Sequence, residues 1–154
     1  MSRLAFLSPH EADAAAVSPL RHVSAAVFSD VSYLGKLEVR GDVESLDALP
    51  LGPGRVLVVL EGDVRGERDR LVEQGYRVYD MTAALAALEL EGEDLMRRLT
   101  ELDLEALPAI GSIARGTTAL IERRDGERFR IFVPQELGQF VAEVVTDMAR
   151  GLGR

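Results

Sequence analysis

Residues 117–133, TTALIERRDGERFRIFV, form the stretch that decides the fold. Two runs of β-forming residues flank Asp125-Gly126, a pair that accepts the positive φ angles of a tight type I′ turn. The stretch therefore predicts a β-hairpin. Because side chains alternate along a strand, one face of the second run carries three large apolar residues, Phe129, Ile131 and Val133.

A helical pattern follows the hairpin. Pro134 ends the second strand, because proline cannot donate a hydrogen bond to a neighbouring strand. Residues 135–152 then carry apolar side chains at the spacing of an amphipathic helix. The buried stripe predicted for this helix consists of Leu137, Phe140, Val141, Val144, Met148 and Leu152.

Upstream, two strand patterns enclose a loop pattern. Residues 35–40 alternate apolar and charged side chains, which is typical of a half-buried strand. Residues 42–54 end in two prolines and two glycines and are predicted as a loop. Residues 55–60 are a short apolar run, typical of a strand that is covered on both faces.

The middle of the chain alternates between helical and extended patterns. Residues 64–74 predict a mostly charged helix that Gly75 ends, and residues 76–79 predict a short strand. Residues 85–91 predict another strand. A helix is then predicted to open at the acidic residues after Gly92, with its leucines turned inward: Leu95, Leu99 and Leu102.

Mixed strands and helices, joined by hairpins rather than strict βαβ units, predict an α+β fold. The sheet is expected to be mixed or antiparallel, with the β-hairpin and the amphipathic helix at the C-terminal end. Residues 1–20, which end in Ser18-Pro19 and Leu20, are predicted as an N-terminal arm, and residues 21–154 as a single domain. His22 to Phe28 is predicted as its first strand.

The composition of the 154-residue chain excludes several classes of binding partner and catalytic site. It contains 26 acidic and 18 basic residues, a formal net charge of −8, so it is a poor general binder of nucleic acid. It has no cysteine, which excludes disulfides, thiolate nucleophiles and cysteine-based metal sites. His10 and His22 are its two histidines and cannot supply a three-histidine metal site. No apolar run approaches the ~20 residues of a membrane span, and the cytoplasm is the expected compartment.

One short pattern occurs twice. Asp30-Val31-Ser32 and Asp80-Met81-Thr82 each combine an aspartate, an apolar residue and a hydroxyl, and each precedes a strand of the form Leu-Glu-apolar-charged-Gly. The spacers differ by one residue. Such aspartates and hydroxyls are more often turn-forming groups, hydrogen-bonded to nearby backbone, than ligands of a bound molecule.

No sequence motif identifies a catalysed reaction. Residues 111–118 resemble a phosphate-binding loop superficially, but Thr117 replaces its lysine and a strand pattern follows where a helix is needed. The neighbouring carboxylates at 91–94 and 101–105 are expected on solvated faces, and Arg123 and Arg124 beside the hairpin turn are expected to be exposed. We therefore predict no catalytic residue and no metal site.

Six stretches of the chain form a pattern found in a known family: residues 31–41 (VSYLGKLEVRG), 79–82 (YDMT), 88–94 (LELEGED), 102–104 (LDL), Pro108 and 129–134 (FRIFVP). They resemble the γ subunit of heterotetrameric sarcosine oxidases, within the folate-binding superfamily of the glycine-cleavage T-protein. The similarity runs from about Ser18 to the C-terminal helix.

The resemblance implies a single-domain folate-binding fold of the T-protein kind and a role as a non-catalytic companion of larger subunits that carry the cofactors. The chain departs from the T-protein pattern after residues 117–124, where a Gly-Gly turn and an acidic pair are missing and Asp125-Gly126 follows directly. The acidic residue that handles folate in that enzyme has no matching position. The cysteine signature of the iron–sulfur-assembly relatives is also missing.

Two hypotheses follow. The first is an accessory subunit of a sarcosine-oxidase-like amine oxidase in one-carbon metabolism, which binds no cofactor itself and uses the larger subunits as partners. The second is a free-standing tetrahydrofolate or pterin binder. A folate pocket needs an apolar slot, a polar group for the pterin edge and cations for the glutamate tail. The candidate residues for that pocket are Tyr33, Asp80, Arg115 and Thr117. A self-associating homo-oligomer without a small ligand is a third possibility.

Overall fold

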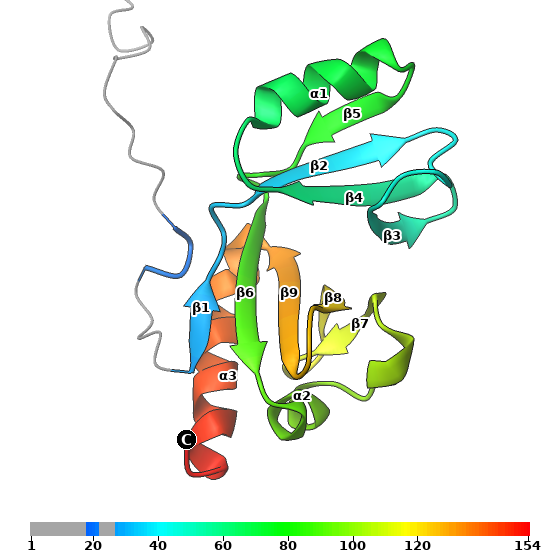
Figure 1. Ribbon diagram of the computed structural model, residues 1–154. Helices are drawn as coiled ribbons and strands as arrows, with labels where there is room; N and C mark the ends of the chain where they lie inside the picture. The colour runs from blue at the N-terminus through cyan, green and yellow to red at the C-terminus, as the bar shows by residue number, and fades with distance from the viewer. Residues whose placement is uncertain (1–17, 22–26) are drawn as a thin grey trace, which may run out of the picture.

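The computed structural model of the chain describes residues 18–21 and 27–154, and the fold within them is α+β (Figure 1). In chain order the elements are β1 (Phe28–Asp30), β2 (Gly35–Arg40), β3 (Leu49–Gly52), β4 (Arg55–Leu60), α1 (Val64–Glu73), β5 (Arg77–Asp80), β6 (Leu85–Glu91), α2 (Glu93–Leu99), the 3₁₀ turn η2 (Leu104–Ala106), β7 (Ala109–Ile113), β8 (Thr117–Arg123), β9 (Arg128–Pro134), the 3₁₀ turn η3 (Gln135–Leu137) and α3 (Gly138–Gly151).

The strands form two antiparallel sheets. The five-stranded sheet has the order β1-β6-β9-β8-β7, and the four-stranded sheet has the order β3-β4-β2-β5. In Figure 1 the four-stranded sheet lies above the five-stranded one, with α1 on its outer side, while α3 runs alongside the five-stranded sheet. The predicted hairpin is confirmed as β8 and β9, with Ile121 opposite Ile131. The predicted C-terminal helix is confirmed as α3.

The four-stranded sheet is built from the consecutive strands β2 to β5, whereas the five-stranded sheet combines β1 with the later strands β6 to β9. β1 precedes β2 in the chain but pairs with β6, with Phe28 opposite Leu90. β5 precedes β6 but pairs with β2, with Tyr79 opposite Glu38. The two connections, β1 to β2 and β5 to β6, therefore pass each other where the sheets meet.

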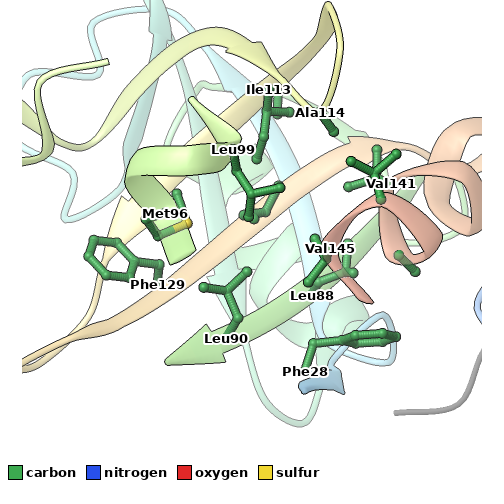
Figure 2. Close-up of a cluster of buried hydrophobic side chains, with 14 of the residues drawn as sticks. Phe28, Leu88, Leu90, Met96, Leu99, Ile113, Ala114, Phe129, Val141 and Val145 are labelled. Carbon is green, nitrogen blue, oxygen red and sulfur yellow. The ribbon is translucent and has the colours of Figure 1, made fainter. Parts of the chain in front are cut away.

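The largest hydrophobic core lies between the five-stranded sheet and the helices α2 and α3 (Figure 2). Phe129, Ile131 and Val133 all belong to it, as their alternation predicted. Gly138 lets α3 approach β6 closely, because a Cβ atom there would lie 2.8 Å from the Cβ atom of Ala86. A side chain at this position would push the helix away from the sheet.

Two smaller cores complete the packing. Leu37, Val39 and Leu71 fill the space between the four-stranded sheet and α1. Between the two sheets, Leu57 of the four-stranded sheet packs in one cluster with Phe132 of the five-stranded sheet. Because this cluster takes residues from both sheets, it fixes one sheet against the other.

The burial of β2 differs from the prediction. Its bounds are as predicted, but the strand is covered on both faces instead of one, and even Lys36 and Glu38 are buried. The reason is tertiary: β2 is a central strand, with α1 on one side and the five-stranded sheet near the other. Arg40 and Arg55 donate hydrogen bonds to Glu38 Oε1 over 2.6 and 3.0 Å. Burial alone would raise the pKa of Glu38, but these hydrogen bonds outweigh it and hold the pKa below its ordinary value.

Two turn predictions were wrong. The stretch predicted as a loop contains the edge strand β3, where Pro50 is tolerated because one side of an edge strand needs no donor. The Asp125-Gly126 turn is not type I′, because Gly126 alone of the pair has a positive φ, 59°. The hairpin closes through a hydrogen bond from Arg124 N–H to the Arg128 carbonyl instead.

The buried stripe of α3 also differs from the prediction. Val141 and Val144 are buried, but Leu137 and Phe140 are 36 % and 40 % exposed. Leu137 belongs to the tighter 3₁₀ turn η3 and not to the α-helix, whereas Phe140 lies within the helix but outside its buried face. The small residues Gly138, Ala142 and Ala149 face the sheet and are buried.

Residues 1–17 of the predicted arm and residues 22–26 of the predicted first strand lie outside the described residues, as do both histidines. The described end of the arm is a turn, and its Leu20 is 2 % exposed and packs in the largest core. The first described strand, β1, begins at Phe28.

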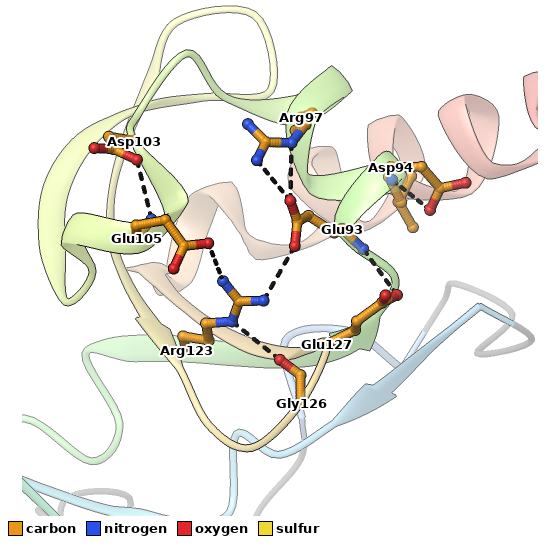
Figure 3. A network of polar contacts seen from close by, with 9 residues as sticks. Glu93, Asp94, Arg97, Asp103, Glu105, Arg123, Gly126 and Glu127 are labelled. Atoms are coloured by element: carbon orange, nitrogen blue, oxygen red, sulfur yellow. Dashed lines mark hydrogen bonds and ion pairs between the residues drawn. The ribbon is translucent and has the colours of Figure 1, made fainter.

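A polar network holds the tip of the β8–β9 hairpin against α2 and η2 (Figure 3). Arg123 was expected to be exposed, but its guanidinium contacts Glu105 at 2.9 Å and Glu93 at 3.1 Å. Its Nε also donates to the Gly126 carbonyl over 3.0 Å. Arg123 is therefore half-buried, because the two acidic side chains approach it from other elements.

Candidate functional site

The repeated pattern forms two equivalent turns where the sheets meet. Asp30 Oδ1 accepts a hydrogen bond from Ser32 N–H over 3.0 Å, and Asp80 Oδ1 accepts one from Thr82 N–H over 2.9 Å. The turn-forming role weighed for these residues is thus confirmed. Ser18 Oγ donates to the second oxygen of Asp30, which connects the described end of the arm to the first turn.

Each turn also binds the strand that follows the other turn: the Ser32 turn binds β6, and the Thr82 turn binds β2. Ser32 Oγ accepts a hydrogen bond from Ala87 N–H over 3.0 Å, and Thr82 Oγ1 accepts one from Lys36 N–H over 3.1 Å. Val31 N–H donates to the Ala87 carbonyl, and Met81 N–H donates in the same way to the Lys36 carbonyl. Lys36 and Ala87 therefore occupy equivalent positions of the two halves.

Lys36, the one lysine of the chain, is fully buried beside these turns. Its Nζ donates a hydrogen bond to the Ser32 carbonyl over 2.7 Å. Burial lowers the pKa of Lys36 from 10.5 to about 8, although the carboxylates of Asp30 and Asp80 favour the charged form. No local pattern predicted this burial, because Lys36 occupies a charged position of a strand in which apolar and charged residues alternate.

A pocket of about 800 Å³ opens over the two turns. Its walls combine carboxylates, hydroxyls, one amide and apolar groups, and its most exposed large side chain is Tyr33, at 70 %. Such a mixture suits a small organic molecule with an apolar face and a polar edge. The lining residues are Ser18, Pro19, Asp30, Ser32, Tyr33, Asp80, Thr82, Ala83, Leu85 and Gln135.

The structure brings two of the four predicted folate residues together. Tyr33 and Asp80 line this pocket, whereas Arg115 and Thr117 do not. Arg115 and Thr117 lie at the connection between β7 and β8, and β7 is the sheet edge opposite to β1. Sequence reasoning missed Lys36 and Gln135 as neighbours of the site; the repeated turn pattern was the signal that pointed to this region.

The connection between β7 and β8 is not a phosphate-binding loop, in agreement with the sequence analysis. Gly111 lies within β7, and the residues after the turn continue as strand β8. Ala114 and Arg115 have positive φ angles of 46° and 64° and form a tight turn, closed by a hydrogen bond from Gly116 N–H to the Ile113 carbonyl. The helix N-terminus that phosphate binding needs is replaced here by a hairpin.

Within residues 18–21 and 27–154, no three His, Asp or Glu side chains gather in a way that could hold a metal ion. In the same part of the chain, no helix is long and apolar enough to cross a membrane. Three of the carboxylates that were expected on solvated faces, Glu93, Asp94 and Glu105, pair with arginines. Glu93, for example, pairs with Arg97 and Arg123.

Comparison with known proteins relates the fold to that of a solved structure. The sequence matches no known protein-family model and no curated protein. Among solved structures, a chain of the heterotetrameric sarcosine oxidase from Corynebacterium sp. U-96, in complex with pyrrole 2-carboxylate, superimposes with a TM-score of 0.73 at 18 % sequence identity. The match covers 90 % of this chain and 96 % of that chain. This chain therefore has the α+β fold of a sarcosine oxidase subunit, with antiparallel sheets and a C-terminal helix.

Proposed function

We propose that this chain is a non-catalytic accessory subunit of a heterotetrameric amine oxidase of the sarcosine-oxidase type, acting in one-carbon metabolism with larger subunits as partners. The observation that supports the proposal most is the structural match over nearly the whole of both chains. Two chains that cover each other in this way are of similar length. The relative is thus one small component of a larger assembly.

Exposed apolar side chains support a role in assembly. Tyr33, Ile110, Leu137 and Phe140 are all at least 36 % exposed. Leu137 and Phe140 lie on η3 and the first turn of α3, next to Gln135 of the pocket. Exposed apolar residues that are neighbours in the chain, as Leu137 and Phe140 are, suit a surface that binds another protein.

The buried charges have structural partners. Glu38 pairs with Arg40 and Arg55, and Glu122 pairs with Arg130 over 3.1 Å. Hydrogen bonds from Arg40 and Arg55 hold the pKa of Glu38 below its ordinary value, whereas a catalytic acid needs a raised pKa. This arrangement fits a companion subunit better than an enzyme.

The test is assembly with the larger subunits encoded in the same cell. We expect a stable complex, detected by native mass spectrometry after co-expression. A charged residue at an exposed interface position, Phe140→Asp, is expected to weaken that complex. Val72→Asp on α1, where Val72 is 50 % exposed, is the matched control. Failure to form any complex, or amine oxidation by the isolated chain, would contradict the proposal.

A second candidate function is a free-standing tetrahydrofolate or pterin binder, and the pocket at Tyr33 and Asp80 is the observation that favours it. Saturating tetrahydrofolate should then stabilise the isolated chain by roughly 3 kcal/mol at a hundredfold excess over the dissociation constant. The effect should vanish in Tyr33→Ala and persist in Tyr79→Ala, which changes a tyrosine that does not line the pocket. An unchanged melting temperature of the unmodified chain would remove this candidate.

A further inference from the structure

Three arginines form a row across the four-stranded sheet, called here the arginine row. Arg40 ends β2 and lies opposite both Arg55, which begins β4, and Arg77, which begins β5. The row therefore lies at the end of the sheet that is remote from the two crossing connections (Figure 1). Residues that are opposite each other on neighbouring strands point to the same face of a sheet, so the three side chains share one face.

This face is the one that α1 does not cover. Val39 packs with Leu71 of α1, and because side chains alternate along a strand, the side chain of Arg40 points to the opposite face. Arg55 and Arg77 are exposed, and the side chain of Arg40 is 40 % exposed. Another molecule can therefore reach all three arginines.

The positive charge of the arginine row is balanced only in part. Glu38 pairs with Arg40 and Arg55 through a single oxygen, Oε1. Arg77 has no ion-pair partner within residues 18–21 and 27–154. Like charges that lie opposite each other on neighbouring strands destabilise a sheet. A destabilising arrangement of this kind is typical of positions that serve binding and not the fold itself.

Tyr79 adds an aromatic side chain to this surface. It lies opposite Glu38, two residues from Arg77, and it is 45 % exposed. The Arg40 guanidinium lies over the Tyr79 ring, 4.8 Å from the ring centroid. Its Nε donates to Glu38, whereas its two Nη atoms have no hydrogen-bond partner among the described residues. A guanidinium that is held by stacking and keeps free donors is well suited to bind a carboxylate.

We propose that the arginine row and Tyr79 bind an acidic segment of a larger partner subunit. Carboxylates of the segment pair with the guanidinium groups, and an apolar side chain of the segment packs on the exposed part of the Tyr79 ring. Nucleic acid would be repelled by the rest of the chain, whose net charge is −8. A small free anion would gain little from exposed, screened charges, whereas a polypeptide brings several carboxylates at once. The inference rests on the proposed function, which supplies the partner chain.

The first test reverses one charge of the row in the complex with the larger subunits. Arg77→Glu is expected to weaken the affinity at least tenfold, because like charges would then meet; no ion pair within the described part of the chain is lost. The matched control is Arg68→Glu on α1, an exposed position on the other side of the sheet, which changes the net charge equally and should leave the affinity unchanged. Equal affinities of the two variants would overturn the inference.

The second test identifies the interaction as electrostatic and locates it. The affinity should fall as the salt concentration rises, and it should fall less steeply for Arg77→Gln than for the control Arg68→Gln. In the unmodified complex, assembly should slow hydrogen exchange along β5 but not along α1. The same salt dependence in both variants, or unchanged exchange along β5, would overturn the inference. A complex that forms without these effects leaves the proposed function intact, whereas absence of any complex refutes both.

Discussion

The two turns at the meeting point of the sheets make the same backbone contacts but carry different side chains. In one half, Thr82 binds the amide of Lys36; in the other, Ser32 binds the amide of Ala87. Both Lys36 and Ala87 are fully buried. The backbone geometry is thus satisfied equally well by the longest side chain of the site and by one of the shortest.

This difference separates what the fold needs from what is particular to this site. The fold needs the hydroxyl, the aspartate and the two exchanged backbone hydrogen bonds, because these appear in both halves. It does not need a lysine, since Ala87 serves in the equivalent place. The buried ammonium of Lys36 is tolerated because the Ser32 carbonyl and two nearby carboxylates compensate part of its lost hydration.

The largest effects are expected from the leucines that follow these two positions. Leu37→Ala and Leu88→Ala each remove a fully buried side chain, and both should lower the free energy of unfolding by about 2–5 kcal/mol. Leu88→Ala should cost more, because Leu88 lies in the largest core, whereas Leu37 lies in a smaller core. Urea unfolding measures both. A larger loss for Leu37→Ala would contradict this ranking of the two halves.

Lys36 should make the free energy of unfolding depend on pH, whereas Ala87, in the equivalent position, has no group that titrates. Above pH 8 the folded chain loses the Lys36 proton while the unfolded chain keeps it up to pH 10.5, so the free energy of unfolding rises with pH in this window. Relative to Lys36→Met, the unmodified chain should gain on the order of 2–3 kcal/mol between these pH values. Parallel unfolding curves of the two proteins, with no gain between pH 8 and 10.5, would show that the pKa of Lys36 is not lowered.

The two hydroxyls should contribute about equally. Ser32→Ala and Thr82→Val each leave one buried amide without its side-chain acceptor, and each should cost about 1–2 kcal/mol. Hydrogen exchange should become faster at Ala87 in the first variant and at Lys36 in the second. Thr82→Ser keeps the acceptor and serves as the control. Faster exchange at the wrong amide in either variant would refute the reciprocal pairing.

The smallest effect is expected on the surface of α3. Phe140→Ser should change the free energy of unfolding by less than about 1 kcal/mol, because Phe140 is 40 % exposed. The buried neighbour Val141, changed to alanine, should cost more. Thermal denaturation ranks the two variants directly. A greater loss of stability in Phe140→Ser than in the Val141 variant would support the buried stripe predicted from the sequence.

Sequence periodicity predicted the elements whose pattern is local. The β8–β9 hairpin, the helix α1 that ends before Gly75, and the turn-forming role of Asp30 and Asp80 all depend on residues a few positions apart. The predicted exposure of β2 and the predicted stripe of α3 were wrong for a different reason. Burial depends on which elements cover each face of a strand or helix, and those elements lie far away in the sequence.

The candidate site was predictable only in part. The repeated pattern located the two turns, and Tyr33 and Asp80 do line one pocket. Arg115 and Thr117 were grouped with them by residue type, but the strand order places their hairpin at the opposite edge of the sheet from β1. The burial of Lys36 and the arginine row follow from the packing and pairing of strands, which no local pattern records.

The sequence by itself determined the α+β class, most of the strands and helices, and the two aspartate turns, because alternation, helical spacing and side-chain-to-backbone hydrogen bonds act over short distances along the chain. The tertiary structure alone decided that β1 joins β6 and β5 joins β2. It also decided which charges are buried and where the pocket at Tyr33 lies. The physical reason is that strand pairing and burial depend on residues that are far apart in the sequence, such as Phe28 and Leu90, and meet only when the chain has folded.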